Sequence, residues 1–276
     1  MVMMSDMDSP IAVLDSGVGG LSVLRELLCV LPHESYVFYG DEANAPYGTK
    51  RHEEVRRITF ANVERLRNEY GCKAVVIACN TATGAAAAAL RSALPELPII
   101  GIEPELKSAA LMGEHPRVLV MATPLTLRQD KFLELRNRFS DRADFTLLPC
   151  PGLMELIESG HIHDALLKRY LDSLFSALDA DSFDAVVLGC THFPLLVGPI
   201  RHALGPGVRV VSSAEETTRE LTDILTRREQ LAGDAAEPQH RFATTADNIA
   251  EFAVAGSFIF GQPLKSIEHI DIDELK

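Results

Sequence analysis

The chain alternates short, wholly apolar runs with longer segments in which apolar residues recur every three to four positions. The short runs are typical of strands buried on both faces of a parallel sheet, and the longer spacing is typical of amphipathic helices. In the first part of the chain the expected strands are 11–14, 36–39, 74–78 and 99–102, and the expected helices are 21–31, 52–69 and 83–94. This alternation predicts an α/β protein with a mostly parallel central sheet flanked by helices.

The same order of elements then starts again. One pair of segments matches without a gap: Ala74-Val-Val-Ile-Ala-Cys79-Asn-Thr81 and Ala185-Val-Val-Leu-Gly-Cys190-Thr-His192, 111 residues further on. Any two buried strands look alike, but burial does not explain a cysteine at the same place in both. We therefore expect two pseudo-symmetric domains. The second copy has expected strands at 117–121, 145–148, 185–189 and 208–211, helices over 125–139 and 195–204, and helical patterns between 152 and 178.

The residues after the second copy have no counterpart in it. They contain expected helices over 214–229 and 247–258, with a polar stretch between them that reads as a surface loop at 234–238. We expect this tail to pack back on the first copy. The expected domains are therefore 1–102 together with 214–276, which contributes Cys79, and 103–213, which contributes Cys190.

Composition and charge narrow the class of protein. The 276 residues are 47% apolar, and 26 Lys and Arg stand against 39 Asp and Glu, a net charge of −13. That balance argues against a nucleic-acid partner. Five cysteines are too few and too uneven for a secreted disulfide framework. Residues 1–10 have no signal-peptide pattern and no apolar run reaches about 18 residues, so we expect a soluble cytoplasmic protein without a membrane partner.

Two cysteines lie where an open α/β sheet binds ligands, beyond the carboxyl ends of its strands. Cys79 and Cys190 each follow an expected strand and precede a helical segment, and Asp15 and Ser16 follow the first strand. A helix N-terminus favours the thiolate of such a cysteine. Two equivalent thiols on two equivalent halves suggest a cleft with one thiol on each wall.

A facing pair of thiols suits proton transfer better than the alternatives. A redox pair usually shares one Cys-x-x-Cys, which is absent, and a zinc site needs three or four ligands, for which two cysteines and His192 are poorly spaced. One thiolate can instead remove a proton from one face of a carbon while the opposite thiol delivers a proton to the other. Of the other cysteines, Cys29 and Cys72 are expected to be packing residues, and Cys150 is left open.

The loop Asp15-Ser-Gly-Val-Gly-Gly20-Leu-Ser22 follows the first strand and opens a helix. A dinucleotide-binding loop would need glycine in place of Ser22 and an acidic residue closing a second strand about 20 residues on, but Glu34 precedes that strand instead of ending it. We favour a tight turn whose N–H groups bind a small carboxylate. Asp15 is expected to orient the first thiol or to contact a substrate amino group, and His192 to do the matching task beside Cys190, although a single histidine is more often structural.

Four segments at these positions carry a family likeness. They are Asp15-Ser-Gly-Val-Gly-Gly20, Asp41-Glu-Ala-Asn-Ala-Pro46-Tyr47-Gly48, Ala78-Cys79-Asn80-Thr81-Ala82 and Gly189-Cys190-Thr191-His192-Phe193-Pro194-Leu195-Leu196. In order and spacing they resemble the glutamate racemases of the cofactor-independent aspartate/glutamate racemase superfamily. The resemblance implies two α/β domains with the active site in the cleft between them. It also implies interconversion of L- and D-glutamate without pyridoxal phosphate or metal, so no cofactor is expected.

The resemblance implies roles for single residues as well. Cys79 and Cys190 would be the two bases, assisted by Asp15 and His192. Glu158 matches a glutamate that lies near the second base, although a glutamate on a helix is ordinarily only solvated. The residues expected around the substrate are Asp15, Ser16, Pro46, Tyr47, Gly48, Asn80, Thr81, Thr123, Thr126, Thr191 and His192.

Some segments depart from the family pattern, and they bear on the choice of substrate. Charges at 103–107 are added, the residues after Thr126 lack the expected Ser and Tyr, and Thr244-Thr245 stands in place of Thr-Gly. His192, where aspartate racemases tend to have Glu, favours glutamate. The expected function is thus a glutamate racemase that supplies D-glutamate for peptidoglycan. The alternatives are a racemase or isomerase of a related acid such as aspartate, and a non-catalytic two-lobed dicarboxylate-binding protein.

The sequence does not fix the quaternary state. The family usually forms dimers, so a homodimer is expected, but no interface can be named. Control by an allosteric ligand is also left open.

Overall fold

The computed structural model describes residues 7–179 and 182–271, and the chain divides into two compact units. Unit 1 contains the residues up to Ile102 together with those from Ala214 onward, and unit 2 is Glu103–Ser213. Part of the stretch inspected for a signal peptide, residues 1–6, lies outside the described residues. No helix in the described ranges is both long and apolar enough to cross a membrane.

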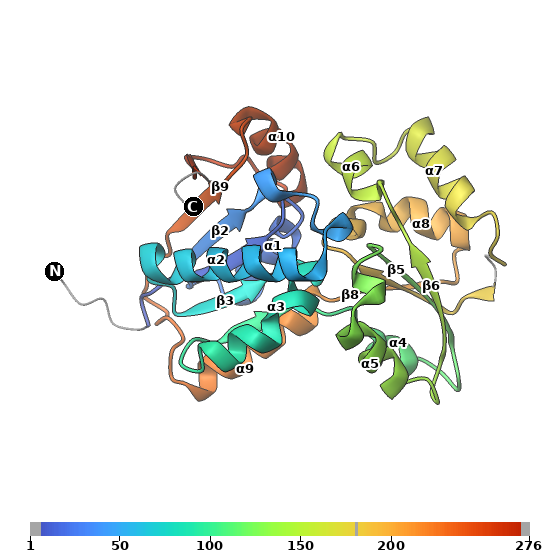
Figure 1. Cartoon of the computed structure of the whole chain (residues 1–276), viewed down its shortest axis with the longest axis horizontal. Coiled ribbons are helices and arrows are strands. Elements are labelled where there is room, and N and C mark those ends of the chain that lie inside the picture. The colour runs from blue at the N-terminus through green and yellow to red at the C-terminus, as the bar shows by residue number, and fades with distance from the viewer. Residues whose placement is uncertain (1–6, 180–181, 272–276) are drawn as a thin grey trace. The chain divides into compact units, whose positions relative to one another are not determined.

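Unit 1 is built on a six-stranded sheet in which all strands run parallel. The strand order is β10-β9-β2-β1-β3-β4, and Figure 1 labels β9, β2 and β3 of this sheet. The central strands are buried on both faces, as their unbroken apolar runs predict. The strands are β1 (Ile11–Asp15), β2 (Tyr36–Gly40), β3 (Ala74–Ile77), β4 (Ile99–Gly101), β9 (His240–Thr244) and β10 (Ile267–His269).

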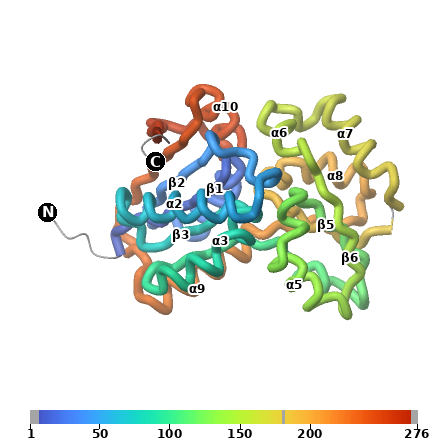
Figure 2. Tube along the Cα trace, viewed as in Figure 1, coloured from blue at the N-terminus to red at the C-terminus, as the bar shows by residue number. Residues whose placement is uncertain are grey.

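Two groups of helices accompany this sheet. Helix α1 (Leu21–Val30) packs against α9 (Ala214–Arg227) and α10 (Ile249–Phe260), and α2 (His52–Tyr70) packs against α3 (Asn80–Ala93). Figure 2 shows that the chain from Ala214 onward runs beside the N-terminal segments.

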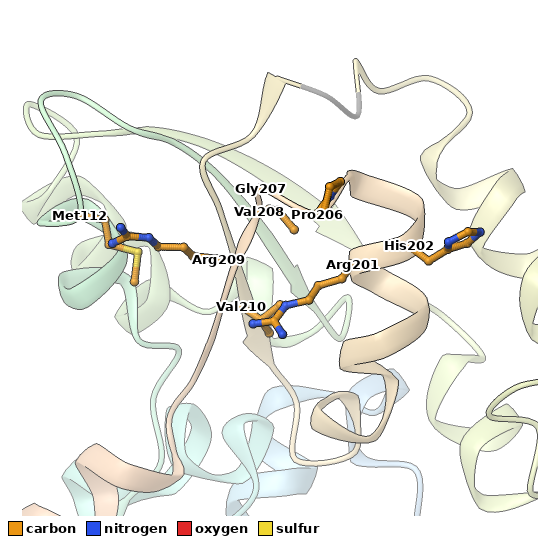
Figure 3. A pocket seen from close by; sticks show the side chains of 8 residues that line it. All are labelled: Met112, Arg201, His202, Pro206, Gly207, Val208, Arg209 and Val210. Atoms are coloured by element: carbon orange, nitrogen blue, oxygen red, sulfur yellow. The ribbon is translucent and has the colours of Figure 1, made fainter.

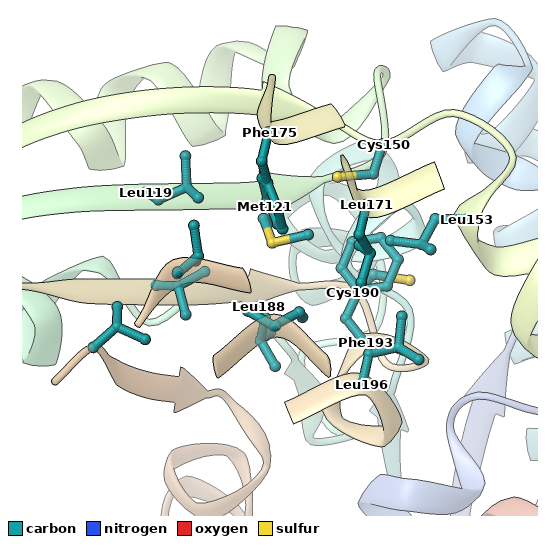
Figure 4. Close-up of a cluster of buried hydrophobic side chains, with 14 of the residues drawn as sticks. Leu119, Met121, Cys150, Leu153, Leu171, Phe175, Leu188, Cys190, Phe193 and Leu196 are labelled. Atoms are coloured by element: carbon teal, nitrogen blue, oxygen red, sulfur yellow. The ribbon is translucent and has the colours of Figure 1, made fainter. Parts of the chain in front are cut away.

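Unit 2 has a four-stranded parallel sheet, with β5 (Arg117–Ala122) between β6 (Asp144–Pro149) and β7 (Ala185–Gly189), and β8 (Arg209–Ser212) outside β7. Its core has two apolar clusters, one on each face of the sheet, because side chains alternate along β5. Figure 4 shows the first of them. The helices are α4 (Leu106–Ala110), α5 (Asp130–Arg138), α6 (Leu153–Glu158), α7 (Ala165–Phe175) and α8 (Val197–Leu204).

The two sheets repeat one topology. The order β2-β1-β3-β4 in unit 1 corresponds strand for strand to β6-β5-β7-β8 in unit 2. The matched segments noted in the sequence are β3 and β7 with the residues that follow them. The prediction of two pseudo-symmetric α/β halves with parallel sheets is therefore confirmed.

Several local predictions were wrong. The helix expected over 125–139 is broken, because Gln129 adopts an extended backbone (φ −69°, ψ 136°) between the 3₁₀ helix η3 (Thr126–Arg128) and α5. Strands β9 and β10 and helix α4 were not foreseen. Helix α4 and strand β10 are short, and β9 begins with two exposed residues and pairs with the distant strand β2. Cys29, expected to be a packing residue, lies exposed near the end of α1, whereas Cys72 is buried.

Candidate active site

The register of unit 1 brings the first group of predicted residues to one edge of the sheet. Leu14 of β1 pairs with Ile77 of β3, so Ser16 and Cys79, each two residues further on, leave neighbouring strands at the same level. Cys79 then caps α3, and the N–H of Thr83 donates to its carbonyl. The thiol is therefore beside the N-terminus of a helix, as the sequence predicts.

A chain of hydrogen bonds connects this thiol to a buried carboxylate. The Cys79 Sγ lies 3.7 Å from Ser16 Oγ, and Ser16 Oγ lies 3.3 Å from Asp15 Oδ1. Asp15 also accepts the backbone N–H groups of Ser16 and Gly20. Gly20 has to be glycine here, since a Cβ on it would lie 2.7 Å from the Cβ of Asp15. Ser16 therefore connects the carboxylate of Asp15 to the thiol of Cys79.

The Pro46–Gly48 segment lies beside the same helix. Tyr47 and Gly48 belong to the 3₁₀ helix η2 (Tyr47–Thr49), which contacts α3. Tyr47 is almost completely buried, and its hydroxyl donates to Asp41 Oδ2 at 2.5 Å. Burial, with the carboxylate of Asp41, raises the pKa of Tyr47 well above its ordinary value. Tyr47 therefore stays protonated and serves as a hydrogen-bond donor.

Asp41 is the centre of a network that the sequence reading missed. It is fully buried and accepts from Asn62 Nδ2 at 2.9 Å, from Asn44 Nδ2 at 3.0 Å and from Thr245 Oγ1 at 3.0 Å, in addition to Tyr47. Asp41 opens one of the quoted motifs, which was the available signal. Nothing in the sequence pairs it with Thr245, a residue of the segment after β9.

The other predicted residues of unit 1 are in the first turn of α3. Asn80 and Thr81 are buried, and Asn80 Nδ2 donates to the carbonyl of Ile102 at 3.4 Å. These are the first two residues of α3, so the N-terminus of this helix lies next to the thiol. Such a position suits a carboxylate ligand.

Unit 2 places its thiol at the equivalent point. Cys190 follows β7, and its Sγ lies 3.8 Å from His192 Nδ1. The other ring nitrogen of His192 lies 2.7 Å from Glu158 Oε1, at the end of α6. His192 is 0% exposed. Burial by itself lowers the pKa of His192, but its hydrogen bonds to Cys190 and Glu158 and their negative charges outweigh burial and raise it well above its ordinary value.

The predicted threonines of unit 2 occupy the same edge. Ala122 of β5 pairs with Gly189 of β7, so Thr123 leaves its strand level with Cys190, as Ser16 does with Cys79. The hydroxyl of Thr123 donates to Thr126 Oγ1 at 2.9 Å and accepts the Thr126 N–H. Thr191 is buried next to Cys190.

Cys150, left open by the sequence, lies on the other side of β5. Its N–H donates to the Ala122 carbonyl, as the N–H of Asp41 does to Asp15, so Cys150 takes the place in unit 2 that Asp41 has in unit 1. It belongs to the same apolar cluster as Cys190 (Figure 4). Burial raises the pKa of the Cys150 thiol, which favours its neutral form.

Two of the added charges at 103–107 interact with residues of unit 2. Glu103 pairs with Lys131 at 3.2 Å, and Glu105 caps α4 by accepting the N–H of Ser108. Lys107 is exposed on α4. Within the described part of the chain no group of three or more His, Cys, Asp or Glu side chains is arranged to hold a metal ion.

A separate hollow in unit 2, of about 770 Å³, lies at the opposite end of β8 and contains none of the predicted site residues. Its basic residues are Arg201, His202 and Arg209, and Figure 3 shows that Arg209 and His202 point to different sides. These side chains do not converge on one ligand position.

Comparison with known proteins places the chain in a family. The family model described as Asp/Glu/hydantoin racemase matches residues 20–221. A glutamate racemase from Clostridium novyi is 45% identical over 222 residues, which are 80% of this chain and 85% of the relative.

Two solved structures are also similar. The glutamate racemase isoform RacE1 from Bacillus anthracis has a TM-score of 0.87 at 35% identity, covering 96% of this chain and 98% of that one. The Francisella tularensis glutamate racemase, solved in complex with D-glutamate, has a TM-score of 0.85 at 25% identity, covering 98% and 100%.

The fold and these matches together define the class of protein: an isomerase, of the racemase type that works without a cofactor. The chain belongs to the Asp/Glu/hydantoin racemase family.

Proposed function

We propose that the protein is a glutamate racemase in which Cys79 and Cys190 are the two acid–base groups. One observation carries the proposal: the two thiols follow equivalent strands of equivalent sheets, each with a hydroxyl on the neighbouring strand end. Racemisation needs two groups that exchange roles between the forward and reverse directions, and a repeated unit supplies them.

In each turnover one thiolate takes the α-proton of the amino acid, and the thiol of the other unit delivers its proton to the opposite face of the same carbon. The first cysteine ends as a thiol and the second as a thiolate, so the reverse reaction uses the same groups with roles exchanged. Ser16 and Asp15 assist Cys79, and His192 and Glu158 assist Cys190, along the hydrogen bonds described above.

Recognition of the substrate is assigned to short polar groups near the two thiols. The N-terminus of α3, with nearby hydroxyl and amide side chains, suits a carboxylate without a cationic partner. Glutamate is the substrate we favour because the relatives above are glutamate racemases and one was solved with D-glutamate. The assigned residues are Ser16, Pro46, Tyr47, Gly48, Asn80, Thr81, Thr123, Thr126, Thr191 and the helpers Asp15 and His192.

Exchange with solvent tests the proposal. L-glutamate and L-aspartate are each incubated with the protein in deuterated water, and the α-carbon is followed by NMR and by chiral chromatography. We expect deuterium and D-enantiomer to appear with glutamate. Exchange with aspartate alone would reassign the substrate, and exchange with neither acid would refute the glutamate assignment.

The biological setting belongs to the same proposal. A cytoplasmic glutamate racemase supplies D-glutamate for peptidoglycan, and we propose this role and a homodimeric state for the protein. Depletion of the enzyme in its host should then be relieved by added D-glutamate, and sedimentation should give twice the mass of one chain.

A further inference from the structure

The segment 41–50 contains three of the residues assigned to the substrate, Pro46, Tyr47 and Gly48, yet it has little regular structure of its own. Its helical turns are η1 (Glu42–Asn44) and η2, of three residues each. Residues 42–46 are half-buried or exposed, whereas Tyr47 and Gly48 are buried. A segment with so little internal structure keeps one position only when side chains of other elements hold it.

Asp41 is the fixed point at the start of this segment. Its N–H donates to the carbonyl of Asp15, at the end of β1, at 3.0 Å, and its side chain is fully buried. Its Oδ2 accepts the hydroxyl of Tyr47 at 2.5 Å, which joins the two ends of the turn over 41–47. The position of Tyr47, and of Gly48 after it, therefore depends on the orientation of the Asp41 carboxylate.

Thr245 holds one oxygen of that carboxylate. It is 2% exposed and lies directly after β9, the strand that pairs with β2 (Figure 1). Its Oγ1 donates to Asp41 Oδ1 at 3.0 Å and accepts the N–H of Ala43 at 3.0 Å. A hydroxyl has one proton to donate and lone pairs to accept with, so these two partners suit it. One hydroxyl thus contacts both the carboxylate and the backbone of the segment.

Thr245 is itself fixed to the sheet. Its N–H donates to the carbonyl of Gly40, the last residue of β2, at 3.1 Å. Thr244 Oγ1 donates to the same carbonyl at 3.0 Å and accepts the N–H of Ala246 at 3.1 Å. The end of β9 and the end of β2 are therefore locked together, and the Thr245 hydroxyl is presented to Asp41 from a rigid support.

Asn62 holds the other oxygen of the carboxylate. It belongs to α2 and is 1% exposed. Its Nδ2 donates to Asp41 Oδ2 at 2.9 Å and lies 3.3 Å from the hydroxyl oxygen of Tyr47. The two carboxylate oxygens are thus held from two different elements, the segment after β9 and helix α2.

We propose that Thr245 and Asn62 are positioning residues of the racemase, which act through Asp41 to hold Tyr47 and Gly48 where the substrate binds. The inference rests on the proposed function, which assigns Pro46–Gly48 to the substrate. Loss of either residue reduces the fraction of molecules whose segment is in the binding position, and the apparent KM rises in proportion. The two thiols stand on other segments, so kcat is largely retained.

Steady-state kinetics of the full chain, in both directions, test the proposal. Thr245→Val removes the hydroxyl and keeps the shape of the side chain. We expect it to raise KM for L- and D-glutamate at least about 10-fold and to change kcat less than about 3-fold. Thr245→Ser keeps the hydroxyl, and its KM should stay within about 2-fold of the wild type. An unchanged KM in Thr245→Val, or an equal rise in both variants, would overturn the proposal.

Thr222→Val is the matched control. It removes a threonine hydroxyl from the same C-terminal part of unit 1, but one that donates to the Thr218 carbonyl within α9, at 2.8 Å. It should leave KM and kcat unchanged. Asn62→Ala removes the hold from α2 and should raise KM as Thr245→Val does. It reports independently if urea titration shows that Thr245→Val fails to fold, and an unchanged KM in Asn62→Ala would remove Asn62 from the proposal.

Hydrogen exchange separates this inference from the proposed function. Exchange of the backbone amides of 41–50 is followed by mass spectrometry on the full chain without substrate. It should be at least about 3-fold faster in Thr245→Val than in the wild type or Thr222→Val. Faster exchange without racemisation by the wild type would leave the hold on the segment established and the activity refuted. Racemisation by the wild type, with equal exchange and equal KM in Thr245→Val, would leave the racemase established and the positioning role refuted.

Discussion

Units 1 and 2 share a topology and a thiol position but not the groups around the thiol. In unit 1 the proposed helpers, Asp15 and Ser16, stand at the end of the adjacent strand β1. In unit 2 the proposed helper is His192, two residues after Cys190, and its other ring nitrogen lies 2.7 Å from Glu158 Oε1 of α6. The place of each sulfur depends on strand register, which the repeat preserves, whereas its charge depends on neighbours that are free to differ.

The residues that follow β2 and β6, next to the ends of β1 and β5, also differ between the two units. Asp41 in unit 1 is a buried carboxylate with four side-chain donors, and Cys150 in unit 2 is a neutral thiol within an apolar cluster. A symmetric reaction therefore does not require symmetric surroundings. In the mechanism proposed above it requires two groups that can each give and take a proton, and each unit would meet that condition with different neighbours.

Loss of either thiol should have the largest effect on racemisation. It tests whether the cysteines of the two units have equivalent roles. Cys79→Ser and Cys190→Ser should each lower kcat/KM for racemisation by at least about 10³-fold in both directions, because one acid–base group is lost. In deuterated water each variant should still exchange the α-proton of one enantiomer only, and the two variants should differ in which one. Full racemisation by either variant would contradict the two-base assignment.

Loss of the helper in unit 2 should come next. His192→Asn should lower kcat by about 10²- to 10³-fold, since Cys190 loses its proton partner. The deficit should be greatest for the enantiomer that Cys190 deprotonates, as measured by initial exchange rates. An equal loss for both enantiomers would mean that the histidine acts on binding or folding and not on one thiol.

A backbone change in unit 1 should have a smaller effect. Alanine at Gly20 would place a Cβ 2.7 Å from the Cβ of Asp15 and 3.0 Å from that of Ala78, so the carboxylate must move. Gly20→Ala should lower kcat by about 10²-fold, as expected of a displacement near 1 Å. Gly233→Ala is the control, because nothing lies within 4 Å of its added Cβ. Equal activity of the two variants would argue against a role for the position of Asp15.

The smallest effect should be on stability and its dependence on pH. The pKa of His192 in the folded protein is raised above the 6.5 of a free histidine, so its charge stabilises the fold below about pH 6.5 and that contribution is lost as pH rises through the folded pKa. The difference in unfolding free energy between the wild type and His192→Asn should therefore shrink from pH 6 to pH 9 in urea titrations. Exposed His202→Asn is the control, and a difference that grows with pH would contradict the prediction.

Much of the fold could be predicted from the sequence, and the reason is visible at particular elements. Strands β1, β3, β5 and β7 are short apolar runs, and such runs predict burial on both faces of a sheet. Strands β9 and β10 were missed because each contains exposed polar residues that interrupt the apolar run, and β9 pairs with β2, far along the chain. The break at Gln129 was missed because helical spacing continues through it.

Part of the candidate site could likewise be predicted from the sequence, and part could not. The sequence alone determined that two cysteines follow equivalent strands and that helper residues stand close to each, because local periodicity and a repeated segment are properties of neighbours along the chain. The structure alone decided which groups touch. Ser16 meets Cys79 across 63 positions of sequence, Glu158 meets His192 across 34, and Thr245 meets Asp41 across 204. Such contacts depend on strand register and helix packing, and these arise only when the distant segments fold together.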